Sequence, residues 1–184
     1  MLRRLFLLAA VPALLLTGAT SAYAGTGGPS GTVPPLTVVE VGSAVRFGTV
    51  VQPGAVNPAV LMSQVVTMTN QQRSANGCGQ LVVDRELIVA SVRQSLYMAR
   101  TGRFSHVWND GTNFVRRSHE AGYEQPSGEN IAWGYRTASE VVGAWMASPR
   151  HRANMLNCGA HSIGTGVAYG ANGVPYYTQV FGWD

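Results

Sequence analysis

The order of the hydrophobic patterns along the chain limits the folds that it can adopt. Four stretches before residue 149 carry apolar residues at helical spacing, and in the clearest of them Asp84 can cap a helix that runs to about Thr101. The chain then alternates at strand spacing over 162–169 and 175–181, with a turn at 171–173. Helices followed by a terminal hairpin favour an α+β domain over a parallel sheet of βαβ units.

Capping residues define the ends of these predicted elements. Gly102 and Gly122 end the second and third helices, and Thr137 with Glu140 forms a capping-box pattern before the fourth, which Pro149 closes. The predicted helices cover residues 60–74, 84–101, 113–121 and 137–148, and further short strands are predicted over 36–41, 44–51 and 130–135.

The first 59 residues precede the predicted domain. Residues 1–24 have a short basic start, a 12-residue apolar run and an Ala-x-Ala ending, which are typical of a secretory signal peptide. Ala19 stands where a lipoprotein would carry its lipidated Cys, so no stable membrane anchor is expected. Residues 25–59 are rich in Gly and Pro and predict a linker. The globular domain is therefore expected over 60–184, in a secreted, extracellular protein.

The charge of the chain argues against nucleic-acid binding. The 13 basic residues are all Arg, against 9 acidic residues, for a formal net charge of +4. Arg3 and Arg4 belong to the predicted signal peptide, so the exported chain keeps a charge of about +2. No basic run remains that could follow a phosphate backbone.

The chain has two cysteines, Cys78 and Cys158, separated by 80 positions. In an exported protein the simplest interpretation is one structural disulfide, and the alternative is a pair of buried thiols. Zinc ligation by these residues is disfavoured, because neither has a Cys or His partner at metal-ligand spacing.

Two histidines and one glutamate are the candidates for chemistry. His106 and His151 each follow a predicted helix, and Glu129 lies between them, 23 and 22 residues away. Imidazole and carboxylate ligands suit Zn²⁺, and three protein ligands would leave one position open. The alternative is that each side chain holds a loop to the core by hydrogen bonds. A serine hydrolase is disfavoured, because Pro149 separates Ser148 from His151 and no Gly-x-Ser-x-Gly motif occurs.

Several ordered motifs between about residues 61 and 183 resemble one family. The most specific are GENIA at 128–132 and WMASPRHRANML at 145–156, with MARTGRFSH at 98–106, IGTGV at 163–167 and YTQVFG at 177–182 in support. With these motifs the chain resembles bacterial members of the CAP superfamily. Their extracellular SCP-like domain is shared with cysteine-rich secretory proteins, antigen 5 and pathogenesis-related proteins. The placement of Cys78 and Cys158 resembles secreted actinobacterial members.

The resemblance implies an α–β–α sandwich with a central cleft. In the family this cleft has two His and two acidic residues, which bind Zn²⁺ in some members. His106 and His151 match the histidines, Glu129 matches one acid, and Asn154 is expected to support the site by hydrogen bonding. The second acid has no clear counterpart, since the expected region is basic and Glu120 is merely the nearest acid.

These features predict a secreted binding or envelope-interaction module. Its ligand would be a lipid, a sterol, another small amphipathic molecule or a cell-wall component. Zinc at His106 and His151, with Glu129 nearby, is not a required cofactor, and the protein is expected to be a monomer. The alternative functions are an extracellular, peptidase-like hydrolase that uses His106, Glu129 and His151, and a purely structural domain. The missing second acid and the lack of a recognisable nucleophile favour binding.

The signal-peptide hypothesis predicts cleavage after Ala24. An intact-mass measurement on the exported protein should therefore correspond to a chain that begins at Gly25. Retention of Met1 on the exported protein would contradict the prediction.

Overall fold

The computed structural model describes residues 39–41, 44–46 and 56–184. The predicted signal peptide 1–24 and most of the predicted linker 25–59 lie outside the described residues. Within the linker, β1 (Val39–Val41) and β2 (Ala44–Arg46) pair antiparallel, inside the two stretches predicted as strands. The chain divides into two compact units, 1–48 and 49–184.

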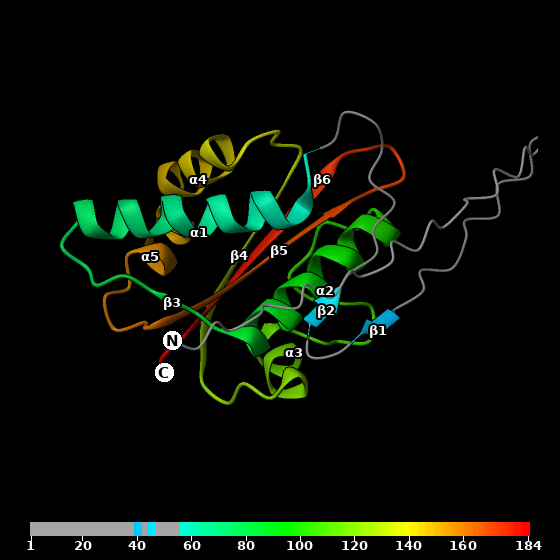
Figure 1. The fold of residues 1–184 in the computed structure, drawn as a ribbon, viewed down its shortest axis with the longest axis horizontal. Helices are drawn as coiled ribbons and strands as arrows, with labels where there is room; N and C mark the ends of the chain where they lie inside the picture. Colours follow the sequence, from blue (N-terminus) through cyan, green and yellow to red (C-terminus); the bar gives the residue numbers. More distant parts are fainter. Residues whose placement is uncertain (1–38, 42–43, 47–55) are drawn as a thin grey trace, which may run out of the picture. The chain divides into compact units, whose positions relative to one another are not determined.

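The second unit is a four-stranded sheet between two layers of helices (Figure 1). The strand order is β3-β5-β6-β4, with β5, β6 and β4 antiparallel and β3 parallel to β5. Helices α1, α4 and α5 cover one face of the sheet, and α2 and α3 cover the other. This arrangement confirms the expected α+β class and α–β–α sandwich. The elements are α1 (Pro58–Ala75), β3 (Val82–Val83), α2 (Arg85–Thr101), α3 (Phe114–Ala121), β4 (Pro126–Trp133), α4 (Ala138–Ala147), α5 (Pro149–Met155), β5 (Ser162–Tyr169) and β6 (Pro175–Gly182).

The predicted capping residues are confirmed. The Asp84 side chain accepts a hydrogen bond from the backbone N–H of Leu87 at 2.8 Å, and Thr137 with Glu140 forms a complete capping box. Gly102 and Gly122 have φ of +67° and +101°, in the left-handed region that favours glycine. Each side-chain cap contributes about 1 kcal/mol to the stability of its helix.

Three elements differ from the sequence prediction. Pro149 predicts the end of α4 and a loop after it, but the same proline also begins helix α5, at its first position. Strand β4 begins at Pro126 rather than Asn130, because its first half buries polar residues that mimic a loop. Strand β3 has two residues and was not predicted.

The main hydrophobic core lies between the sheet and the layer of α1 and α4. Trp145 of α4 is 2% exposed, and its indole Nε1–H donates to the Ile131 carbonyl of β4 at 3.1 Å. Tyr177 of β6 is equally buried, and its hydroxyl donates to the Tyr135 carbonyl at 2.7 Å. These two bonds tie the buried aromatic rings to the backbone, so the core fixes the position of β4 relative to α4.

On the other face of the sheet, α2 packs directly against the backbone of β5. A Cβ atom at Gly164 would overlap the backbone of Leu87, and one at Gly166 would overlap the backbone of Ser91. The Ser91 hydroxyl donates to the Gly164 carbonyl at 3.0 Å. Only glycine therefore permits this approach, which explains the glycines within the alternating pattern of 162–169.

Cys78 and Cys158 form the predicted disulfide, with Cα atoms 4.9 Å apart. It joins the segment after α1 to the loop after α5, and an 80-residue closure contributes about 4–5 kcal/mol in the chain-entropy description.

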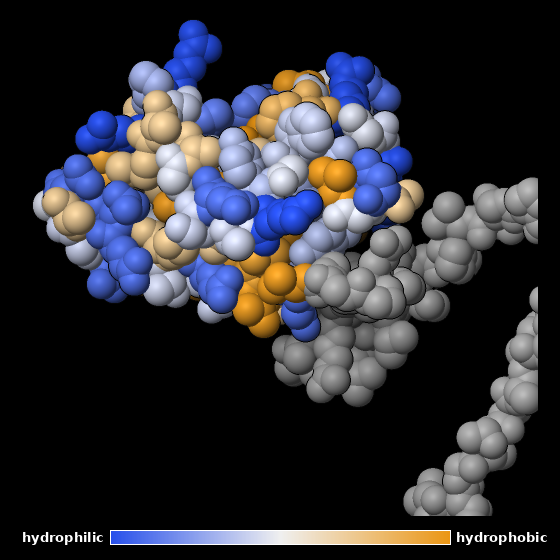
Figure 2. Space-filling view, turned by 90° about the horizontal axis from the view of Figure 1, so that it is seen from above, coloured by the Kyte–Doolittle hydropathy of each residue, from blue (hydrophilic) through white to orange (hydrophobic). Residues whose placement is uncertain are grey.

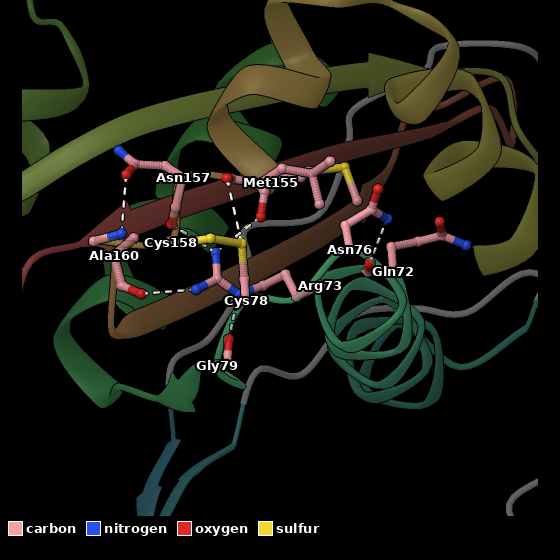
Figure 3. The surroundings of a disulfide bond; sticks show 11 residues. Gln72, Arg73, Asn76, Cys78, Gly79, Met155, Asn157, Cys158 and Ala160 are labelled. Carbon is pink, nitrogen blue, oxygen red and sulfur yellow. Dashed lines mark hydrogen bonds between the residues drawn. A yellow bond between two sulfur atoms is a disulfide. The ribbon is translucent and has the colours of Figure 1, made fainter.

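Beside the disulfide, Arg73 of α1 is fully buried and lies among backbone carbonyls (Figure 3). Its guanidinium donates to four carbonyl oxygens at 2.7–2.9 Å, those of Gly79, Met155, Asn157 and Ala160. Burial lowers the pKa of Arg73, but an arginine side chain still remains charged near neutral pH. Arg73 and the disulfide therefore fix the same loop by independent means.

The buried Tyr177 hydroxyl predicts a loss of stability at alkaline pH. Burial raises the pKa of Tyr177, whereas an unfolded tyrosine ionises near pH 10. A raised folded-state pKa gives stability that is complete below pH 10 and is lost as the pH rises above it. Between pH 9 and 11 the wild type should lose about 1.4 kcal/mol more unfolding free energy than Tyr177→Phe.

Urea unfolding at both pH values measures this difference. Tyr176→Phe is the matched control, since the Tyr176 hydroxyl has no hydrogen-bond partner among the described residues. Equal pH dependence in the wild type and Tyr177→Phe would contradict the expected role of this hydroxyl.

The shared loop predicts that Arg73 matters most once the disulfide is removed. Cys78→Ser/Cys158→Ser should stay folded with a lower Tm, because Arg73 still binds the four loop carbonyls. Adding Arg73→Met should abolish the cooperative thermal transition, whereas adding Arg93→Met, at an exposed position of α2, should not. Circular dichroism melting tests all three variants, and a folded triple variant with Arg73→Met would refute the prediction.

Candidate functional site

His106 and Glu129 are in direct contact. The Nδ1 atom of His106 lies 2.8 Å from Oε1 of Glu129, and the side chains are 49% and 1% exposed, respectively. A buried carboxylate therefore holds a half-exposed imidazole, and the hydrogen bond fixes the ring orientation. The structure thus brings together two of the three residues singled out from the sequence.

His151, the third of these residues, lies on α5. Burial and then the charge of His106 lower the pKa of His151. Its backbone carbonyl accepts a hydrogen bond from the Asn130 side chain of β4 at 3.1 Å. The first turn of α5 is thereby tied to the strand that carries Glu129.

The loop between α2 and α3 positions His106. Gln94 of α2 is fully buried, and its side-chain amide donates to the Ser105 carbonyl at 2.7 Å. The Trp108 indole N–H donates to the Gln94 side-chain oxygen at 2.7 Å, and the Trp108 ring stacks on Tyr97 with centroids 5.1 Å apart. Side chains of α2 therefore fix the loop on both sides of His106.

Asn154 of α5 supports the strand that carries Glu129. Its Nδ2 donates to the Glu129 carbonyl at 3.1 Å and to the Asn130 side-chain oxygen at 2.9 Å. A Cβ at Gly128 would lie 2.9 Å from the Asn154 side-chain oxygen. Gly128 of the GENIA motif thus leaves space for Asn154 of the WMASPRHRANML motif.

Arg117 is the site residue that the sequence analysis missed. It belongs to α3, is fully buried, and places NH2 at 2.6 Å from Oε2 of Glu129. The same guanidinium donates to the His106 carbonyl at 3.2–3.3 Å and to the Thr112 carbonyl at 3.1 Å. Its carbon lies 5.5 Å from the centroid of the Trp108 ring, within cation–π range.

The spacing of residues in α3 indicates that Arg117 lies on the inward face of the helix. Phe114, Arg117, Ser118 and Ala121 follow the i, i+3, i+4, i+7 pattern of an inward helix face. An arginine on that face needs a buried acceptor, and Glu129 provides it. Glu120, the nearest acid to the gap in the family pattern, is instead exposed on α3 and pairs with Arg116 at 2.8 Å. It does not enter the site.

The residues present do not fit a zinc site with three protein ligands. Both carboxylate oxygens of Glu129 are engaged, Oε1 by His106 and Oε2 by Arg117. The described part of the chain contains no group of three or more His, Cys, Asp or Glu side chains arranged to hold a metal ion. The two imidazoles are the donors that remain, fewer than a zinc site normally has.

The site also lacks an activated hydroxyl beside the imidazole, as far as the described residues go. The Ser105 hydroxyl donates to the Val107 carbonyl at 2.9 Å and accepts the Val107 N–H at 3.1 Å. It is therefore used within its own turn. The arrangement can donate and accept hydrogen bonds through imidazole, but it provides no nucleophile.

Two surface hollows lie away from these residues. One, of about 420 Å³, is lined by residues of α1 and by the start of α4, and the other, of about 360 Å³, by residues of α4 and α5. Neither is lined by His106, Glu129 or His151. The face seen in Figure 2 carries its apolar side chains in separate groups among hydrophilic ones.

Known proteins share both the fold and the sequence pattern. The Bacillus subtilis protein YkwD is 37% identical over 105 residues, which are 56% of this chain and 40% of YkwD. A Bacillus anthracis extracellular protein containing a SCP domain superposes with a TM-score of 0.64 at 26% identity, over 69% of this chain and 41% of that one. This chain thus spans less than half the length of either relative.

A more distant structure supports the fold alone. An outer surface protein of Borrelia burgdorferi superposes with a TM-score of 0.63 at 19% identity, over 69% of this chain and 95% of that one. The sequence profile described as the CAP, cysteine-rich secretory protein family matches residues 66–181, which hold α2 to α5 and the four-stranded sheet except its last residue, Gly182. By this match the chain belongs to the CAP, or cysteine-rich secretory protein, family.

Proposed function

We propose that this protein is exported and that its CAP domain binds a component of the cell envelope at the site of His106, Glu129 and His151. The observation that carries the proposal is the hydrogen-bonded series Arg117–Glu129–His106. It fixes one imidazole at the surface without placing a nucleophile beside it. A site that is rigid, polar and without a nucleophile suits recognition better than bond cleavage.

Export is supported by independent features. The first 24 residues have the pattern of a secretory signal peptide, and the disulfide suits an oxidising compartment. The Bacillus anthracis protein of the same fold is itself extracellular.

The surroundings of the two histidines favour an amphipathic ligand with an anionic group. Phe104 and Val107 lie close to His106 in the same loop and are 47% and 40% exposed, so they can contact an apolar part of a ligand. Arg150 and Arg152 are exposed on α5, the helix that carries His151, and their positive charge favours a ligand with phosphate or carboxylate. Anionic envelope lipids combine both properties, and anionic wall polymers share the negative charge.

Hydrolysis is the second candidate, and one observation favours it. A carboxylate bonded to Nδ1 of an imidazole is the arrangement that prepares histidine as a general base. The base would then have to activate a water molecule, because the Ser105 hydroxyl is engaged within its own turn. Peptide or wall-fragment cleavage that Glu129→Gln abolishes would favour this function over binding.

The binding function predicts co-sedimentation of the purified protein with isolated cell-wall sacculi or with anionic lipid vesicles. His106→Ala/His151→Ala should bind roughly tenfold more weakly, because the loss of hydrogen bonds to a polar ligand costs about 1–2 kcal/mol. His161→Ala, at an exposed histidine in another loop, is the matched control and should bind as the wild type does. Mass spectrometry of solvent extracts from the purified protein distinguishes a lipid ligand from a wall polymer.

The proposal fails if the wild type sediments with neither material and carries no extractable lipid. It also fails if the double alanine variant binds as strongly as the wild type.

A further inference from the structure

The ion pair between Arg117 and Glu129 is distinguished by the burial of both side chains. Among the ion pairs between described residues, it is the one in which both side chains are fully buried, at 0% and 1% exposure. A buried carboxylate needs a positive partner, and in a metal site the metal ion supplies that charge. Here a side chain of the same chain supplies it.

We propose that the Arg117 guanidinium is a built-in cation that takes the place of a divalent metal beside Glu129 and positions His106 through that carboxylate. The site then binds its ligand without a metal ion. Metal-free ligand binding rests on the proposed function, whereas the role of Arg117 in positioning His106 does not.

The use of the Glu129 oxygens is the first support. Oε1 is 2.8 Å from His106 Nδ1, and Oε2 is 2.6 Å from Arg117 NH2. A metal ion that coordinated Glu129 would have to displace one of these partners. Displacing Arg117 would leave a buried guanidinium without its counter-charge, and displacing His106 would free the ring from the carboxylate that orients it.

The anchoring of the guanidinium is the second support. The carbonyls of His106 and Thr112 accept its hydrogen bonds, and the Trp108 ring lies beside it. The Nε atom of Arg117 has no hydrogen-bond partner among the described residues. Among those residues, the Glu129 carboxylate is the one anionic group that pairs with the guanidinium. An arginine stays charged at any physiological pH and, unlike a metal ion, is not removed by chelators.

The effect on His106 follows from this geometry. An ionised Glu129 accepts a hydrogen bond, so Nδ1 of His106 must be the donor. The other ring nitrogen, Nε2, has no partner among the described residues and remains available to a ligand. Because Arg117 also binds the His106 carbonyl, one guanidinium fixes both the backbone and, through Glu129, the ring. Arg117 is thus a positioning residue.

Zinc calorimetry on the purified protein, dialysed first against EDTA, tests the metal part. The wild type and Arg116→Met, a control at the exposed neighbouring arginine, should give no binding heat with Zn²⁺. Arg117→Met frees Oε2 of Glu129 and should gain Zn²⁺ affinity by at least roughly tenfold, since a third donor joins the two imidazoles. Zn²⁺ binding by the wild type that His106→Ala/His151→Ala abolishes would overturn the proposal.

Nitrogen-15 NMR of the His106 ring tests the positioning part and does not depend on any ligand. The wild type, Arg116→Met and Arg117→Lys, which keeps the charge, should all show the tautomer protonated at Nδ1. Arg117→Met should show a mixture of tautomers. An unchanged tautomer in Arg117→Met, or a mixture in Arg117→Lys, would refute the role of the charge.

Folding of the variants distinguishes a role of the Arg117 charge from a role in packing. If Arg117→Met does not fold, Arg117→Met/Glu129→Gln should fold, because it removes both charges of the pair together. An unfolded double variant would mean that Arg117 acts by packing, and the proposal would fall.

Binding to sacculi or vesicles, measured with and without EDTA, separates the two proposals. Binding that is unchanged by EDTA supports a metal-free site, and binding that EDTA abolishes overturns it. A lack of binding under both conditions refutes the proposed function and the metal-free binding clause. The role of Arg117 is then tested by the calorimetry and the NMR alone.

Discussion

The closeness of α2 to the backbone of β5 determines where the rest of the site lies. Gly164 and Gly166 let the helix rest on the strand without intervening side chains, and the hydroxyls of two serines of α2 donate to the buried carbonyls of these glycines. Because the helix is held firmly, its buried Gln94 has a fixed position, from which it forms hydrogen bonds with Ser105 and Trp108 of the following loop. The position of His106 is therefore set by a contact made on a different strand from the one that carries its partner Glu129.

Buried and partly buried polar side chains repeatedly satisfy backbone carbonyls in this domain. Arg73 does so for the loop after α5, Gln94 and Arg117 for the loop after α2, and Asn154 for β4. Each bridges segments that are distant in sequence, and each avoids the cost of an unsatisfied buried carbonyl. The loops that carry His106 and Cys158 thus owe their shape to hydrogen bonds from side chains of neighbouring elements rather than to apolar contacts of their own.

Local signals in the sequence predicted much of the fold. The caps at Asp84 and Thr137 and the αL glycines Gly102 and Gly122 placed the helix ends, because caps act within one turn. The first half of β4 and the buried face of α3 were missed. Both contain charged or polar residues whose burial depends on partners elsewhere in the chain, and the pair Arg117 and Glu129 becomes intelligible only when the two are seen together. Single-residue patterns cannot predict such a pair.

The edge strand β4 has a consequence for how copies of the protein behave together. The carbonyls of Glu129 and Ile131 are taken by the side chains of Asn154 and Trp145, so this edge of the sheet offers few free acceptors to another strand. At the opposite edge, β3 has just two residues. Occupied edge carbonyls and a very short edge strand both disfavour pairing with a strand of a second molecule. Polymerisation of crowded copies through their sheets is therefore disfavoured.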